Sequence, residues 1–86
     1  MAVFQSDGKK LLNVEYDAIV EVGDVVDGMR VLSTHAKNSE EYCAFLLEPL
    51  SRRIVCYVFD EVFIVGKSDE FDTLQDAVEA WKSDEI

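Results

Sequence analysis

The amino-acid sequence predicts an α+β fold: a small antiparallel β-sheet or partly closed barrel of five to seven short strands, with one C-terminal amphipathic helix packed on it. Short apolar runs separated by turn residues recur from the start of the chain to Gly66, as in strands joined by hairpins. Beyond Gly66 a single segment carries apolar residues at helical spacing. The length of 86 residues limits the chain to one domain, residues 1–86, because so short a chain buries only one core.

Two hairpins are predicted in the first half of the chain, each around an Asp-Gly pair. Asp7-Gly8 and Asp27-Gly28 both supply the positive φ that a tight turn requires. The strands that these turns would join are residues 3–5, 10–16, 19–26 and 29–34.

The second of these hairpins is predicted to face water on one side. A two-residue loop at Asp27-Gly28 pairs Val22 with Ser33, so that alternate residues share a face. Gly23 predicts a bulge, since a glycine inside a strand accommodates an extra residue. The face toward the core would carry Val20, Val22, Val26, Met29 and Val31.

A third hairpin, residues 41–47 and 53–59, is apolar on both faces. Such strands need cover on both sides. The helix would cover one face, and the other needs either closure of the barrel or a second copy of the chain. In a homodimer the interface would consist of aromatic and aliphatic residues of this second face, namely Tyr42, Leu46, Tyr57 and Phe59.

Both cysteines belong to this hairpin. With the loop centred between Pro49 and Leu50, Cys43 and Cys56 lie opposite each other. We expect them to pack as small apolar thiols in the core. The alternatives are a disulfide, which a reducing compartment disfavours, and a metal site, for which paired ligands two to four residues apart would be usual.

A last strand and the helix complete the predicted fold. Residues 62–65 form a short apolar run that Gly66 ends. The helix is predicted over about residues 72–83, with Asp72 and Gln75 at the spacing of a capping box. Its apolar face would carry Phe71, Leu74, Ala77, Val78 and Trp81.

The order of the strands carries one resemblance. Residues 22–26, early in the chain, and residues 61–65, which close the sheet, follow an order that resembles small Src-homology-type barrels. This resemblance implies a barrel-like fold and no particular function, because the same order occurs in many unrelated proteins.

Charge and composition limit the classes of partner. The net charge of −10 and a pI near 4.3 oppose direct binding to nucleic acid or to an anionic membrane, both of which repel a negative protein. No apolar run approaches the roughly 18 residues of a membrane helix, and the first residues lack a signal-peptide pattern. We therefore expect a cytoplasmic protein that binds a protein with a basic surface.

Catalysis is not expected. Ser33 and His35 would face the same way on one strand, and Asp24 is a carboxylate that could approach them, but no turn motif of a hydrolase accompanies them. The glycines are too scattered for a phosphate-binding loop, and no segment has the carboxylate spacing of a calcium loop. The sequence predicts no cofactor and no metal.

Acidic charge is concentrated toward the C-terminus. Residues 60–86 include nine acidic and two basic residues, whereas the other 59 residues include nine acidic and six basic ones. Carboxylates on one face of the predicted helix lie about 6 Å apart, close to the spacing of phosphates along a nucleic-acid strand. The candidate partner-binding residues are Asp69, Glu70, Asp72, Asp76 and Glu79.

Two functional hypotheses follow. The favoured one is a small inhibitor or regulator that imitates nucleic acid and docks on a basic nucleic-acid-handling protein, as viral and mobile-element products do against host defence. The alternative is a structural or assembly module that forms a homodimer through the apolar face of the hairpin at residues 41–59. Acidic residues on a surface helix also serve solubility alone.

Overall fold

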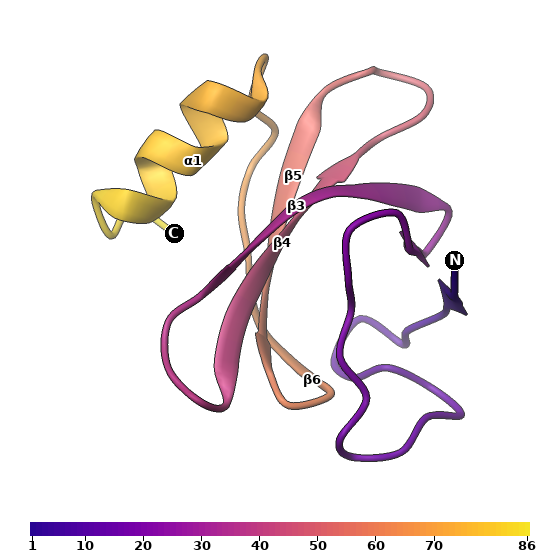
Figure 1. Ribbon diagram of the computed structural model, residues 1–86. Helices are drawn as coiled ribbons and strands as arrows, with labels where there is room; N and C mark the ends of the chain where they lie inside the picture. The colour runs from indigo at the N-terminus through magenta and orange to yellow at the C-terminus, as the bar shows by residue number, and fades with distance from the viewer.

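The computed structural model describes the whole chain, residues 1–86. Six strands form one curled sheet with the shape of a half-barrel, and a single helix packs beside it (Figure 1). This arrangement confirms the predicted α+β class and number of strands. The elements are, in chain order, β1 (Val3–Phe4), β2 (Val25–Val26), β3 (Met29–Ala36), β4 (Glu41–Leu47), β5 (Ile54–Asp60), β6 (Phe63–Lys67) and α1 (Leu74–Lys82).

The strands lie in the sheet in the same order as in the chain. β1 runs parallel to β2, and all other neighbours are antiparallel. The first predicted hairpin is therefore wrong as a pair of strands. Val3 and Phe4 pair with β2, and only one bridge, between Ser6 and Leu11, remains beside the Asp7-Gly8 turn.

Two aspartates explain why the N-terminal segment lies beside β2. The Asp24 carboxylate accepts a hydrogen bond from the Ala2 N–H (2.9 Å). The Asp27 carboxylate accepts from the backbone N–H and the hydroxyl of Ser6 (2.7 and 2.5 Å). Hydrogen bonds to ionised carboxylates are stronger than neutral ones, so these contacts hold β1 against β2.

The Asp27-Gly28 turn is confirmed, since both residues have positive φ (51° and 81°) and β2 and β3 meet across it. The hairpin is shorter than predicted because the chain bends at Gly23, where φ is 93°. The bend leaves Val22 62% exposed, so the expectation that it lies in the core is wrong. The expected bulge is present. The Gly23 N–H donates to the Val31 carbonyl, and the Val31 N–H donates to the Asp24 carbonyl. Gly23 and Asp24 together therefore oppose the single residue Val31.

β4 and β5 form the third predicted hairpin, in a register two residues from the predicted one. Phe45, not Cys43, lies opposite Cys56. The Glu48 N–H donates to the Arg53 carbonyl (2.9 Å), which centres the loop one residue further along the chain than expected. A shift of two residues leaves every side chain on its predicted face.

Both cysteines are free thiols without exposed surface, as expected of core residues. They are diagonal neighbours on the same face of the hairpin. A hydrogen bond with Cys43 and burial together raise the pKa of the Cys56 thiol, which keeps it protonated.

The two faces of the β4–β5 hairpin are covered by different parts of the chain. One face, with Cys43, Phe45 and Cys56, packs against α1. The other is closed by apolar residues of the N-terminal half and of the β5–β6 turn, which are Leu11, Val20, Val26, Met29, Val31 and Val62. The residues considered for a dimer interface lie on this second face: Leu46 and Phe59 have no exposed surface, Tyr57 is 7% exposed, and Tyr42 is half-buried. Closure within the chain, not a second copy, covers them.

The closing contact is made by residues 9–11, which reach β6. The Leu11 N–H donates to the Val62 carbonyl (2.9 Å), and the Ile64 N–H donates to the Lys9 carbonyl (2.8 Å). The N-terminal segment therefore links the two edge strands, β1 and β6. β6 continues past Gly66, which was expected to end it, because Gly66 pairs with Val58.

Helix α1 begins two residues later than predicted and ends one residue earlier. Thr73 is the N-cap, and its side chain accepts a hydrogen bond from the Asp76 N–H (3.1 Å). The predicted capping box at Asp72 and Gln75 is therefore misplaced by one residue. The helix buries Ala77 against the sheet, and Ala80 is buried as well. No helix of the protein has the length and apolar character that crossing a membrane requires.

Candidate partner-binding surfaces

The five candidate residues on and before α1, here called the acidic stripe, are all exposed: Asp69, Glu70, Asp72, Asp76 and Glu79. They differ in their contacts. Glu70 accepts a hydrogen bond from the Ser51 hydroxyl (2.9 Å), and Asp72 forms an ion pair with Arg53 (3.1 Å). Glu79 accepts a hydrogen bond from the Gln75 side chain (3.3 Å). The carboxylates of Asp69 and Asp76 form no ion pair or side-chain hydrogen bond, so the five residues are exposed alike but differ in their contacts.

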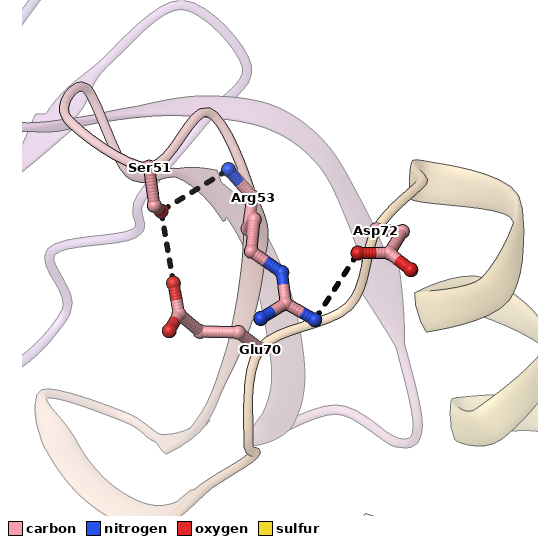
Figure 2. A network of polar contacts seen from close by, with 4 residues as sticks. All are labelled: Ser51, Arg53, Glu70 and Asp72. Atoms are coloured by element: carbon pink, nitrogen blue, oxygen red, sulfur yellow. Dashed lines mark hydrogen bonds and ion pairs between the residues drawn. The ribbon is translucent and has the colours of Figure 1, made fainter.

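Figure 2 shows how the stripe is tied to the rest of the fold. Ser51 and Arg53 come from the β4–β5 loop, and Glu70 and Asp72 come from the segment that leads into the helix. The Ser51 hydroxyl also accepts from the Arg53 N–H (3.3 Å). The Arg53 side chain is 43% exposed and that of Asp72 is 80% exposed, so water screens this ion pair and its contribution to stability is small.

The ion pair between Arg53 and Asp72 is the only one in the molecule. The chain has 18 acidic and eight basic residues. Almost all the carboxylates therefore lack a basic neighbour, and the negative field at the surface is not cancelled from within.

A second acidic site lies at the other end of the sheet. Carboxylate oxygens of Glu40, Asp60 and Glu61, here called the acidic cluster, lie within 4.8 Å of one another. The β3–β4 turn supplies the first residue, and the end of β5 with its turn supplies the other two. The Glu61 N–H donates to the Glu40 carbonyl (3.1 Å), which fixes the two turns side by side. Figure 1 places α1 near the β4–β5 loop and the β5–β6 turn at the opposite end, so the stripe and the cluster are separate.

A groove adjoins the acidic cluster. A hollow of about 370 Å³ is lined by Tyr16, Asp17, Ala18, Ile19, Ser39, Glu40, Tyr42 and Glu61. A neighbouring hollow of about 210 Å³ shares four of these residues, Ile19, Ser39, Glu40 and Tyr42, and extends toward His35. The two hollows together are called the groove below.

The groove has an apolar wall and a polar one. Tyr16 and Ile19 form the first and are 69% and 63% exposed, with the Tyr16 ring 6.2 Å from the ring of Phe63. The β3–β4 turn forms the second. Asn38 shapes this turn, since its side-chain oxygen accepts hydrogen bonds from the N–H groups of Glu40 and Glu41 (2.9 and 2.8 Å).

Tyr42 forms the floor shared by both hollows. Its ring stacks on Phe59 at 5.2 Å, and its hydroxyl accepts a hydrogen bond from the Val20 N–H (2.9 Å). Burial raises the pKa of Tyr42, and the nearby negative charge of Asp24 acts in the same direction. The hydroxyl therefore stays neutral, and the segment that carries Ile19 is bonded directly to the floor.

Sequence reasoning missed the groove and the acidic cluster. The available signal was the pair of acidic dipeptides, residues 40–41 and 60–61, that bracket the third hairpin. Glu41 pairs with Asp60 in the observed register. Recognising that pairing required the correct centre of the β4–β5 loop, which the sequence pattern placed one residue too early.

The residues weighed for catalysis are only partly brought together. Ser33 Oγ lies 3.2 Å from His35 Nε2, as their spacing on one strand predicts. Asp24 does not join them, because its oxygens accept hydrogen bonds from the N–H groups of Ala2 and Glu21 (2.9 and 2.8 Å). No carboxylate orients the His35 ring, whose other contact is the edge of Phe45, so the pair lacks the third member of a triad.

Comparison with protein-family models, characterised proteins and solved structures finds no match to this chain.

Proposed function

We propose that this protein is a non-enzymatic binding module of the cytoplasm whose partner is a protein with a basic surface. The observation that carries the proposal is uncompensated charge: 18 acidic residues, eight basic ones and a single ion pair. Carboxylates that repel one another are relieved when a basic surface approaches, and their field accelerates the encounter. The free thiols of Cys43 and Cys56 fit a reducing compartment.

The acidic stripe is the proposed contact with a nucleic-acid-handling protein. Within α1, Asp76 and Glu79 are three residues apart, a helical spacing that sets carboxylates about 6 Å apart, similar to successive phosphates. Asp69, Glu70 and Asp72 continue the negative charge along the segment before the helix. Arginine and lysine bind carboxylate and phosphate alike, so a groove that holds a nucleic-acid strand would accept the stripe. In this proposal the protein inhibits or regulates its partner by excluding nucleic acid, as a viral or mobile-element mimic acting against host defence would.

The test is capture of partners from host lysate on immobilised protein at low and at high salt. The expected result is a basic nucleic-acid-binding protein that is released by salt or by added DNA, since salt screens exposed charges. The charge-reversed variant Asp69→Lys/Glu79→Lys should lose this protein. These two positions are chosen because neither side chain contacts the β4–β5 loop, and both are exposed.

A matched control is Glu15→Lys/Glu21→Lys, which changes the net charge equally at exposed positions outside the stripe. It should retain most of the captured protein. Equal retention by the stripe variant and the wild type, with unchanged circular dichroism, would refute the stripe as the contact. Absence of any salt-sensitive basic protein from the wild-type eluate would refute the proposed function itself.

A further inference from the structure

The groove presents unpaired negative charge beside a concave surface. Glu40 and Glu61 line the larger hollow, together with Asp17. Asp60 lies against them within the acidic cluster. None of these carboxylates forms an ion pair with a lysine or arginine of the chain. A cation that entered the hollow would therefore meet carboxylates with no competing partner.

The groove also exposes apolar surface that the fold does not use. Tyr16 and Ile19 are large side chains, more than half exposed, on one wall of the larger hollow. Exposed aromatic side chains beside a recess are typical of the residues that contribute most to protein–protein binding. A small cation alone would leave both side chains in water, whereas a side chain with an aliphatic stem would cover them.

The shape of the groove favours an extended chain segment over a free small molecule. The larger hollow, about 370 Å³, lies near the lower limit of ligand sites. The second hollow continues from it over Tyr42. Side chains of residues two apart in an extended chain point to the same side and lie roughly 7 Å apart. Two such side chains can therefore enter the two hollows, one in each.

We propose that the groove receives an arginine side chain from an extended segment of the basic partner, with the guanidinium between Glu40 and Glu61 and the stem against Tyr16 and Ile19. The basic character of the partner rests on the proposed function, whereas the site is a second contact, at the opposite end of the sheet from the acidic stripe. A side chain two residues along the segment occupies the hollow toward His35.

Arginine fits these walls better than lysine does. Its planar guanidinium donates two parallel hydrogen bonds to a carboxylate and stacks on aromatic rings. The larger hollow offers both features, because two tyrosines and three carboxylates line it. The lysine ammonium is compact and strongly hydrated, and it would bind only the carboxylates and not stack on the rings.

The test is a titration of the ¹⁵N-labelled protein with five-residue peptides that differ only in a central Arg, Lys or Gln, monitored by amide chemical shifts. The arginine peptide should shift the signals of residues 16–19, 39–42 and 61. It should bind several-fold more tightly than the lysine peptide, and the glutamine peptide should not bind.

Two matched variants locate the site. Glu40→Gln/Glu61→Gln should weaken the arginine peptide by about ten-fold, because it removes both carboxylate acceptors of the guanidinium. Asp69→Asn/Glu79→Gln removes the same charge from the acidic stripe and should change the affinity by less than about two-fold, since stripe and groove are far apart. A third variant, Tyr16→Leu, should reduce the preference for arginine over lysine because it removes the exposed ring.

Three outcomes would overturn the inference. One is equal weakening by the groove and stripe variants, which would indicate general attraction between charges. Another is equal affinity of the arginine and lysine peptides. The third is groove shifts produced by calcium chloride and not by the arginine peptide, which would identify the acidic cluster as a cation site. Each leaves the lysate capture through the stripe unaffected, so failure of the groove and failure of the proposed function are distinguishable.

Discussion

The acidic stripe and the groove carry the same kind of charge on surfaces of different construction. The stripe lies on one short helix and the segment before it, and two of its five carboxylates are already engaged by the β4–β5 loop. The groove is built from three segments far apart in the chain, and its floor, Tyr42, stacks on the buried Phe59. One surface is a row of charges, and the other is a preformed recess with one apolar and one polar wall.

Density of charge along the chain and suitability for recognition are therefore separate properties of a surface. The stripe is conspicuous in the sequence because its residues are neighbours there. The groove has fewer charges and gains its character from shape and from Tyr16 and Ile19. Substituting the residues that hold each surface in place should therefore lower the free energy of unfolding by unequal amounts.

The largest effect is expected at Asp24, whose carboxylate holds the backbone of Glu21, close in the chain to the groove residue Ile19. Asp24→Ala removes the acceptor of the Ala2 and Glu21 N–H groups. Two hydrogen bonds to an ionised group are lost, so the free energy of unfolding should fall by about 3 kcal/mol, a large part of the total for a domain of this size. Urea denaturation measures it. Asp17→Ala, at an exposed position without such bonds, should stay within about 0.5 kcal/mol of wild type; a similar loss in both variants would contradict this role of Asp24.

The next effect is expected at Tyr42. Tyr42→Phe leaves the partly buried Val20 N–H without its acceptor and should cost about 1.5 kcal/mol. Tyr16→Phe removes an exposed hydroxyl and should change stability little. The two variants, compared by thermal unfolding, separate the floor of the groove from its rim, and equal melting temperatures would show that the Tyr42 hydroxyl does not hold the Val20 segment.

The raised pKa of Tyr42 predicts how the stability of the protein changes at alkaline pH. Because burial raises its pKa above the ordinary value of 10.0, the native state keeps this proton at a pH where the unfolded chain has lost it. Stability is therefore present below about pH 10 and falls as the pH rises through the native pKa. Denaturation at several alkaline pH values should show a shallower fall for Tyr42→Phe than for the wild type, and parallel curves would exclude this contribution.

A smaller effect is expected at the helix cap. Thr73→Ala removes the acceptor of the Asp76 N–H and should cost about 1 kcal/mol. Thr73→Ser keeps an oxygen at that position and should restore most of the loss. Since the cap supports only the stripe, chemical shifts in the groove should not change in either variant; changes there would show that the two surfaces are coupled.

The smallest effect is expected for the ion pair of Figure 2. A double-mutant cycle with Arg53→Ala and Asp72→Ala should give a coupling energy of about 0.5 kcal/mol or less, because both side chains are well exposed. The coupling should shrink further at high salt. A coupling that persists at high salt would mean that the loop and the helix segment are held together more tightly than their exposure implies.

Local patterns in the sequence predicted most of the fold. Asp27-Gly28 located a turn because both residues adopt positive φ, and the apolar spacing of the tail located α1 within two residues at either end. The β4–β5 register was beyond such patterns, because it depends on a loop in which Arg52, an ordinary residue, adopts a positive φ of 62°. The parallel pairing of β1 depends on side chains of Asp24 and Asp27 that bond to backbone groups more than 20 residues away.

The candidate sites divide in the same way, into one visible in the local sequence and one that depends on long-range contacts. The stripe was found because its five residues lie close together in the sequence, two of them, Asp76 and Glu79, at helical spacing within α1. The groove was missed because it requires three long-range facts at once: the position of residues 16–19, the β4–β5 register, and the contact between the β3–β4 and β5–β6 turns. None of these leaves a periodic signal.

The link between residues 9–11 and β6 has a consequence for the order of folding. Leu11 and Lys9 bond to Val62 and Ile64, so residues 9–11 cannot complete their contacts until the later strand β6 has been synthesised. Contacts so distant in sequence slow folding, since a long loop must close before they form. While the chain emerges from the ribosome, the apolar inner face of β4 stays uncovered, and exposed apolar strands of this kind favour aggregation or capture by chaperones. The contact between residues 9–11 and β6 thus closes the second face of the hairpin and ends that exposure.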